Sequence, residues 1–181
     1  AHVLLLCESY TNADTTGENC FLPLKYRTEL TKSHNGLRLF VARGLLDETH
    51  KKHLMYGVKY DCGLEEVARK IVHGENSADH YGVIRFSREN LGNIYGSIID
   101  SFIELLDDKE QLKQAVYPPS TRFGCYSEIE SGKKLVNAVC VYDSKYDSNF
   151  QGNGQGLCMK DGDCIYHESS ICLGGLCFSG K

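Results

Sequence analysis

The sequence predicts a mixed α/β domain followed by a small cysteine-rich tail. Three observations indicate this fold class. Apolar residues recur at helical spacing in the first half of the chain, two strand-like runs follow, and four closely spaced cysteines lie near the end. With 181 residues and 41% hydrophobic composition, the chain is long enough for one core and an appendage. We expect a domain at 1–144, then a hinge and tail at 145–181.

The first expected helix begins near Pro23. Apolar residues follow one another from there at steps of three, four or seven as far as Leu45. Residues 33–35 interrupt this stripe, and we place them on the polar side of the helix. Gly44 and the polar residues after Leu45 predict its end.

A second helix is expected after Asp61, which is the predicted N-cap, and its apolar stripe begins at Leu64. Residues 73–93 resemble a loop that contains only the short apolar run Val83 to Phe86. A third helix is expected over about 95–106, because apolar side chains cover one side of that segment and polar ones the other.

Two strand-like runs, 121–129 and 134–142, are joined by a short connection that suits a hairpin. The second run is apolar almost throughout, as in a central strand buried on both faces. Residues 143–156 are rich in Asp, Ser, Asn, Gln and Gly, which predicts a linker. The remaining segment has too few apolar residues for a core of its own, so we expect disulfides to hold it.

Charge and apolar runs exclude two classes of partner. The net charge is −4, and no basic run is longer than a pair of lysines, so we expect no binding to nucleic acid. The longest purely apolar run, Val3 to Cys7, is far shorter than the roughly 20 residues that span a bilayer. We therefore expect no membrane insertion.

Nine cysteines indicate disulfides and an oxidising compartment. A zinc site would favour pairs spaced as C-x2-C, and none occurs. The odd number leaves at least one thiol unpaired or intermolecular. We expect a secreted, extracellular protein.

Five motifs, in register over residues 33–152, resemble the CAP superfamily, and in particular its secreted nematode members of the Ancylostoma-secreted and venom-allergen types. They are Ser33-His34-Asn35-Gly36-Leu37-Arg38; Tyr60-Asp61-Cys62-Gly63-Leu64-Glu65; Arg88-Glu89-Asn90-Leu91; Phe123-Gly124-Cys125 with Val139-Cys140-Val141-Tyr142; and Asn149-Phe150-Gln151-Gly152.

The resemblance implies a three-layer α-β-α sandwich with a cleft on one side. It also implies disulfides Cys7–Cys20 and Cys125–Cys140. The tail cysteines 158, 164, 172 and 177 would pair among themselves, with connectivity that the sequence leaves open. Cys62 would then be the free thiol, buried beneath the second helix.

The resemblance further implies a cleft with two histidines and two carboxylates that can hold a divalent ion. His80, Glu89 and Glu104 match three of these positions. Gln111 stands where the second histidine should be, three residues before Gln114. A Gln carbonyl is a weak zinc ligand, so we expect no metal and no cofactor there. A loosely held hard ion and a metal-free polar cluster are the two remaining alternatives, and we favour the cluster.

We expect no catalytic residues, since neither a G-x-S-x-G nor an H-E-x-x-H motif occurs. The segment between Cys158 and Cys164 holds Lys160, Asp161, Gly162 and Asp163. An ordinary Asp-Gly turn explains this order. A disulfide-held loop with a basic residue near a Gly-Asp pair also resembles integrin-binding loops.

Some nematode CAP proteins interfere with integrin-mediated platelet or leukocyte adhesion. The resemblance therefore favours a host cell-surface protein as the partner, with an integrin suspected. Two alternatives are a lipid, since some CAP proteins bind sterols or fatty acids, and hydrolysis in the cleft.

Overall fold

A computed structural model of the chain describes residues 20–46, 52–75, 78–89, 104, 107–129 and 134–180. The helix expected over 95–106 lies outside these residues except for Glu104, which is helical. The hairpin connection at 130–133 also lies outside them.

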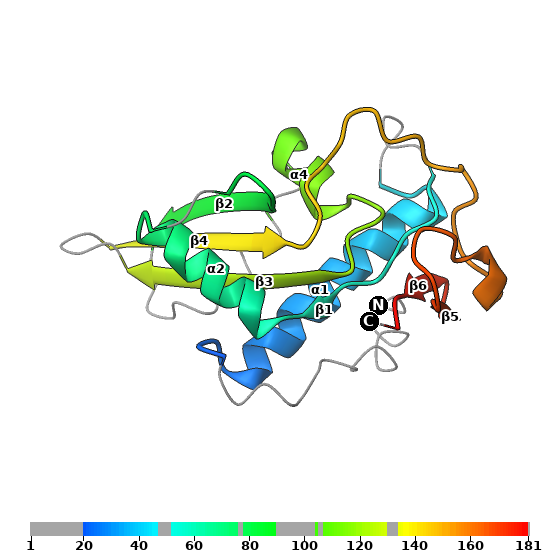
Figure 1. Cartoon of the computed structure of the whole chain (residues 1–181). Helices are drawn as coiled ribbons and strands as arrows, with labels where there is room; N and C mark the ends of the chain where they lie inside the picture. The colour runs from blue at the N-terminus through cyan, green and yellow to red at the C-terminus, as the bar shows by residue number, and fades with distance from the viewer. Residues whose placement is uncertain are drawn as a thin grey trace, which may run out of the picture.

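The described strands form a four-stranded sheet in the order β1-β3-β4-β2, with a separate two-stranded hairpin in the tail (Figure 1). The bounds in the larger sheet are β1 Lys59–Tyr60, β2 Gly82–Glu89, β3 Arg122–Ile129 and β4 Leu135–Tyr142. Strand β1 is parallel to β3, and the other pairs are antiparallel. The strands expected at 121–129 and 134–142 are confirmed, and β4 lies between two neighbours.

Strand β2 was not expected at this length. The sequence predicted a loop with a short apolar run, whereas every residue from Gly82 to Glu89 is paired with one from Tyr142 back to Leu135. Exposed residues alternate with partly buried ones in the second half of β2, and pairing along the whole of β4 extends the strand.

Three helices of several turns are described: α1 Leu24–Arg43, α2 Cys62–Val72 and α4 Lys109–Ala115. The predicted cap of α2 is confirmed, because the Asp61 carboxylate accepts the Leu64 N–H at 3.0 Å. The predicted end of α1 is also confirmed: Gly44 has φ 70°, a left-handed conformation that glycine adopts readily.

The helices cover the two faces of the sheet (Figure 1). On one face α1 and α4 pack with even-numbered residues of β2 and β4, including Ile84 and Ala138, in the main core. On the other face α2 packs against Val139 and Val141. The chain is therefore an α/β sandwich, as expected, with a cysteine-rich tail.

Two of the three residues 33–35 face inward, contrary to the prediction that they lie on the polar side of α1. His34 and Asn35 are fully buried. The His34 ring bonds the Leu30 carbonyl and the Tyr142 hydroxyl, while the Asn35 side chain bonds both backbone groups of Val58. Local pattern could not show these partners, because they come from distant segments.

Arg38 is the largest fully buried side chain among the described residues. Its guanidinium donates to five backbone carbonyls at 2.5–3.2 Å, and these belong to Tyr56, Ala115, Tyr117, Pro118 and Ser120. It therefore fixes the backbone after α4 against α1. Burial lowers the pKa of Arg38 to about 10, so the group stays charged at neutral pH.

The disulfides correct two predictions. Cys20 is bonded to Cys62, so neither the Cys7–Cys20 bridge nor a free thiol at Cys62 is present. The Glu65 carboxylate accepts the N–H groups of Phe21 and Leu22, which brings the segment before α1 to the start of α2. Cys7 lies outside the described residues.

The other expected bridges are confirmed. Cys125–Cys140 joins β3 to β4, and the tail cysteines pair among themselves as Cys158–Cys172 and Cys164–Cys177. All eight cysteines in the described part of the chain are thus in disulfides.

Backbone hydrogen bonds and apolar packing, in addition to the chain connection, join the tail to the domain. Its hairpin consists of β5 Ile171–Leu173 and β6 Leu176–Phe178. Cys177 exchanges backbone hydrogen bonds with Met55 and Gly57. Leu176 and Phe178 lie in the same buried cluster as α1. Although the tail lacks a core of its own, it shares the main one.

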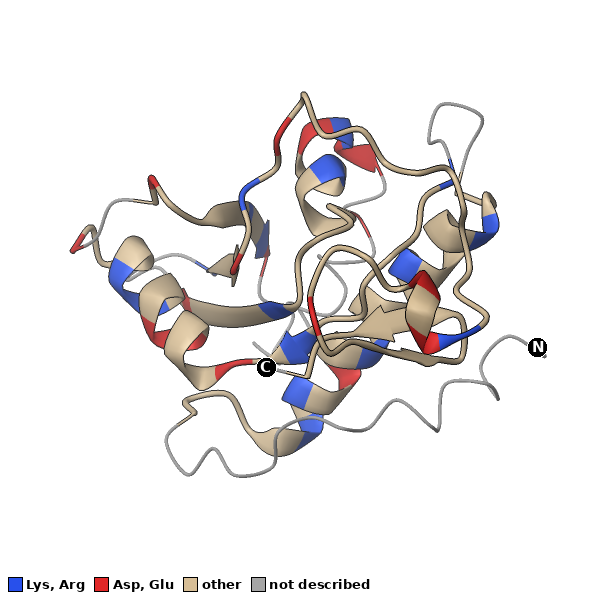
Figure 2. Cartoon of the chain, turned by 45° about the vertical axis from the view of Figure 1, so that its right-hand side comes forward, with Lys and Arg blue, Asp and Glu red and all other residues tan. Residues whose placement is uncertain are grey.

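No helix among the described residues is long and apolar enough to cross a membrane. Basic and acidic residues are interspersed along α2, α4 and the tail (Figure 2).

Candidate functional site

The residues expected in the cleft are not brought together by the structure. His80 is exposed just before β2, and Glu89 is exposed at the end of that strand. Strand β2 has eight residues and ends at Glu89, so its length alone separates the two side chains by roughly 23 Å. Glu89 also points to the face opposite from Arg88, because side chains alternate along a strand.

Glu104 and Gln111 have other partners. The Arg88 guanidinium donates to the Glu104 carboxylate at 2.7 Å. The Gln111 amide donates to Asp108, the N-cap residue of α4, and its oxygen accepts the Arg85 N–H. A divalent ion needs all its ligand atoms within about 2.6 Å of one point. His80 and Glu89 therefore do not fit one metal site with Glu104.

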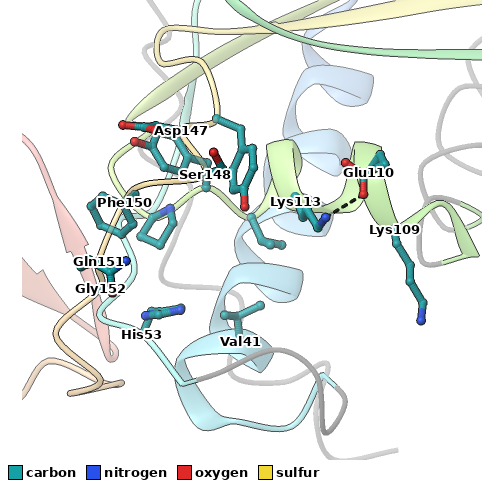
Figure 3. Close-up of a pocket in the computed structure, with 14 residues that line it drawn as sticks. Val41, His53, Lys109, Glu110, Lys113, Asp147, Ser148, Phe150, Gln151 and Gly152 are labelled. Carbon is teal, nitrogen blue, oxygen red and sulfur yellow. Dashed lines mark hydrogen bonds and ion pairs between the residues drawn. The ribbon is translucent and has the colours of Figure 1, made fainter.

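A pocket of about 560 Å³ lies instead beside α4, within the range of roughly 300–1,000 Å³ that is usual for small-molecule sites (Figure 3). It is bounded by α1, by α4 and the turn after it, by His53, and by the segment that follows β4. The residues used below are Val41, Lys113, Tyr117, Tyr146 and Phe150.

One wall of the pocket is aromatic. Tyr117 makes edge-to-face contacts with Tyr146 and Phe150, with ring centroids 5.7 and 5.3 Å away. Burial, together with the charge of Asp147, raises the pKa of Tyr117, so its hydroxyl stays protonated at neutral pH. Val41 of α1 adds an apolar surface.

The other wall is charged. Lys109, Glu110 and Lys113 come from α4, and the Lys113 ammonium is 2.6 Å from Glu110 (Figure 3). The hydrogen bond to Glu110 raises the pKa of Lys113, so it remains a cation. The part of the wall from α4 thus presents two cations, Lys109 and Lys113, and one anion, Glu110.

Gly152 allows this pocket to form. A β-carbon at that position would lie 2.0 Å from Nδ1 of His53, so the backbone can pass the imidazole ring only as glycine. Sequence reasoning missed the pocket because residues 143–156 resemble a linker. Tyr146 and Phe150, two aromatic residues in that polar run, were the available indication.

The two aspartates of the tail loop accept hydrogen bonds from backbone N–H groups of the tail. The Asp163 carboxylate accepts the N–H groups of Met159 and Lys160, and Asp161 accepts that of Cys172. These backbone hydrogen bonds lower the pKa of Asp163. Both carboxylates therefore maintain the shape of the loop, while Lys160 and Gly162 are exposed.

Exposed apolar side chains are concentrated in the tail. Met159 is 86% exposed, Ile165 61% and Ile171 51%, and Leu173 is also exposed. The two disulfides hold this surface rigidly. Ile171 and Leu173 share one face of β5, and contiguous exposed apolar surface is typical of protein interaction sites.

Solved structures of known proteins resemble this one. Manganese-bound Ac-ASP-7, an Ancylostoma-secreted protein, is 35% identical, with 91% of this chain and 93% of that chain covered at a TM-score of 0.80. This chain is a CAP protein. It is of the nematode venom-allergen-like type.

Two more distant structures share the CAP fold. The hookworm platelet inhibitor is 23% identical, covering 91% of this chain and 98% of that one at a TM-score of 0.67. Na-ASP-1 is 17% identical, with 91% of this chain and 49% of that chain covered, and its TM-score is 0.73. No protein-family model and no curated protein sequence matches this chain.

This CAP protein keeps the fold, and strand β2 separates His80 from Glu89. Within the described residues, the one group of three potential metal ligands close together is Cys158, Cys164 and Cys177. All three are in disulfides and offer no thiolate. Among the described residues, the pocket beside α4 and the exposed apolar residues of the tail are two surfaces available for recognition.

Proposed function

We propose that this CAP protein is secreted and binds a host cell-surface protein through its tail. The observation that carries this proposal is the exposed apolar surface of Met159, Ile165, Ile171 and Leu173 on a segment held by two disulfides. A rigid surface loses little conformational entropy on binding, and buried apolar side chains dominate most interfaces.

The finer form of the proposal is antagonism of integrin-mediated adhesion of platelets or leukocytes. Support comes from Lys160 and Asp161, which are exposed in the loop between two disulfide-bonded cysteines. The carboxylate of Asp163 is held against the loop, because its Oδ2 atom accepts two backbone N–H groups. We therefore assign the main contact to the apolar residues and Lys160.

An adhesion assay with the disulfide-intact protein tests the proposal. Ile171→Ser should weaken inhibition of platelet or leukocyte adhesion at least tenfold, which corresponds to the roughly 1.4 kcal/mol of a modest hot spot. Ile129→Ser is the matched control, since Ile129 is 49% exposed at the end of β3. It should inhibit like the unmodified chain.

Two results would contradict the proposal. One is equal inhibition by Ile171→Ser and the unmodified chain. The other is absence of any inhibition or cell binding by the folded protein. Competition with a known integrin ligand separates the integrin from other surface proteins.

The manganese in the structure of Ac-ASP-7 is not carried over to this chain. His80 and Glu89 lie at opposite ends of β2, so the residues at the expected positions do not fit one ion. No reaction is proposed for the same reason, since His80, Glu89 and Glu104 do not converge on one point.

Lipid binding is a second candidate, and the pocket beside α4 favours it. The aromatic wall and Val41 suit an acyl or sterol body, and Lys113 suits a carboxylate or sulfate group. Extraction of the purified protein with organic solvent should then release a bound amphiphile. Tyr146→Ala, at an exposed position of the pocket wall, should weaken binding of a fluorescent fatty acid, while adhesion inhibition by the tail stays unchanged.

A further inference from the structure

The two disulfides of the tail lie side by side. The sulfur atoms of Cys158, Cys164 and Cys177 are all within 4.8 Å of one another, and Cys172 is bonded to Cys158. Four sulfurs from two bridges therefore form one cluster. Cys158, Cys164 and Cys177 are buried, whereas Cys172 is partly exposed.

A second pairing of these cysteines fits the same backbone. Cys172 and Cys177 are directly opposite each other in the β5–β6 hairpin. Their N–H groups donate elsewhere, to Asp161 and Met55, so they form a non-hydrogen-bonded pair. Facing α-carbons in such pairs are about 4.5 Å apart, which is close enough for a disulfide.

The protein already contains a bridge of that kind. Cys125 and Cys140 are facing residues of β3 and β4, and their α-carbons are 4.0 Å apart in a disulfide. The remaining tail cysteines, Cys158 and Cys164, have their sulfurs within 4.8 Å as well. The Cys172–Cys177 bridge can thus form without moving a strand, whereas the Cys158–Cys164 bridge needs two sulfurs that are now within 4.8 Å to approach to about 2 Å.

We propose that Cys172 is a thiol-exchange site, at which a thiol converts the tail to a second connectivity, Cys158–Cys164 with Cys172–Cys177. The partner is a small thiol or the exposed thiol of another protein. The inference goes beyond the proposed function, because it concerns the covalent anchoring of the loop and not its target.

The exchange proceeds in three displacements. The incoming thiolate attacks the sulfur of Cys172, the Cys158–Cys172 bond breaks, and the Cys158 thiolate leaves. That thiolate attacks Cys164, forms Cys158–Cys164 and expels the Cys177 thiolate. Cys177 then attacks Cys172 in the mixed disulfide, forms Cys172–Cys177 and releases the original thiolate. Two disulfides are present before and after, so no net electron transfer occurs.

Exposure and burial set the order of these steps. A thiolate from solvent reaches Cys172 before the three buried cysteines. The exchange also changes the loop that carries Lys160. In the observed pairing Cys158–Cys172 ties the loop to β5, whereas in the second pairing Cys158–Cys164 closes it into a ring of its own.

The test treats the native full-length chain with graded reduced glutathione and no denaturant, followed by acid quenching and alkylation. Trypsin and chymotrypsin then cut after Lys160, Tyr166 and Leu173, which places each tail cysteine on its own peptide. We expect a glutathione adduct on Cys172 first, then peptides joined as Cys158–Cys164 and Cys172–Cys177. Cys125–Cys140, which is fully buried, should stay intact.

The control is the double variant Cys164→Ser, Cys177→Ser. It should take glutathione on Cys172 without forming a new bridge. If that variant does not fold, the proposal is still tested by the unmodified chain. There the site of the glutathione adduct and the pairing of the disulfide-linked peptides are measured. A first adduct on another cysteine overturns the proposal. The proposal is also overturned if the tail keeps Cys158–Cys172 and Cys164–Cys177 up to the glutathione concentration at which Cys125–Cys140 is reduced. Adhesion assays are not involved, so failure here leaves the proposed function untouched.

Discussion

Burial of His34 makes the stability of the fold depend on pH. It is fully buried and bonds Leu30 and Tyr142 with its two ring nitrogens. Burial lowers its pKa to about 3. The folded protein therefore excludes a proton that the unfolded chain binds at its usual pKa of about 6.5. The contribution of neutral His34 to stability is present above that value, and it is lost as the pH falls toward 3.

We predict that His34→Gln reduces the acid sensitivity of folding. One excluded proton lowers the free energy of unfolding by about 1.4 kcal/mol per pH unit. Urea unfolding between about pH 6 and about pH 4 should show a slope that is smaller by this amount in the variant. His80→Gln is the control, because His80 is exposed. Equal slopes in His34→Gln and the unmodified chain would contradict the prediction.

Arg38 supports the backbone of the pocket wall without contacting the pocket itself. Arg38→Met should destabilise the protein by at least about 3 kcal/mol, because each buried carbonyl left without a donor costs about 1–3 kcal/mol. Chemical denaturation measures this loss. Arg43→Met, at an exposed position of the same helix, should change stability by less than about 0.5 kcal/mol. An equal loss of stability in Arg38→Met and Arg43→Met would show that the five hydrogen bonds from Arg38 to backbone carbonyls do not stabilise the fold.

At the scale of elements, the Cys125–Cys140 bridge fixes the register of β3 and β4. It links residues 15 apart in sequence. Replacing both cysteines with alanine should lower the free energy of unfolding by about 2–4 kcal/mol. The loss should appear in denaturation at neutral pH, with the fold retained. A loss below about 1 kcal/mol would mean that strand pairing alone sets the register.

The Cys20–Cys62 bridge joins the segment before α1 to the first turn of α2. Alkylation of the native and the denatured protein should therefore leave Cys62 unlabelled without reductant. The nine cysteines of the chain then leave Cys7 as the odd one, and mass mapping should find the label or an intermolecular bridge there. Labelling of Cys62 would restore the pairing expected from sequence.

For the whole molecule, we predict less than one equivalent of zinc or manganese after dialysis. The reason is the separation of His80 from Glu89 by the length of β2, together with the occupied carboxylate of Glu104. Elemental analysis measures the metal content. Gln111→His should not create a tight site, because one more imidazole does not bring the two ends of β2 together. Stoichiometric metal in either protein would contradict this.

Local features of the sequence determined the elements whose causes are local. Asp61 caps α2 through a residue three positions away, and Gly44 ends α1 by its own backbone angle. The apolar run of β4 predicted its central place, since only a strand covered on both faces can be apolar throughout. The four cysteines of the short tail are close in sequence, so disulfides among themselves could be expected.

Tertiary structure alone decided which distant segments meet. The Cys20–Cys62 pairing depends on Glu65, whose carboxylate holds the backbone of residues 21 and 22. His34 and Arg38 point inward because they form hydrogen bonds there. His34 bonds the Tyr142 hydroxyl, and Arg38 bonds backbone carbonyls between Tyr56 and Ser120. The pocket needs a supposed linker to fold back onto α4. Such contacts carry no local pattern, because their free energy comes from groups that only the fold brings together.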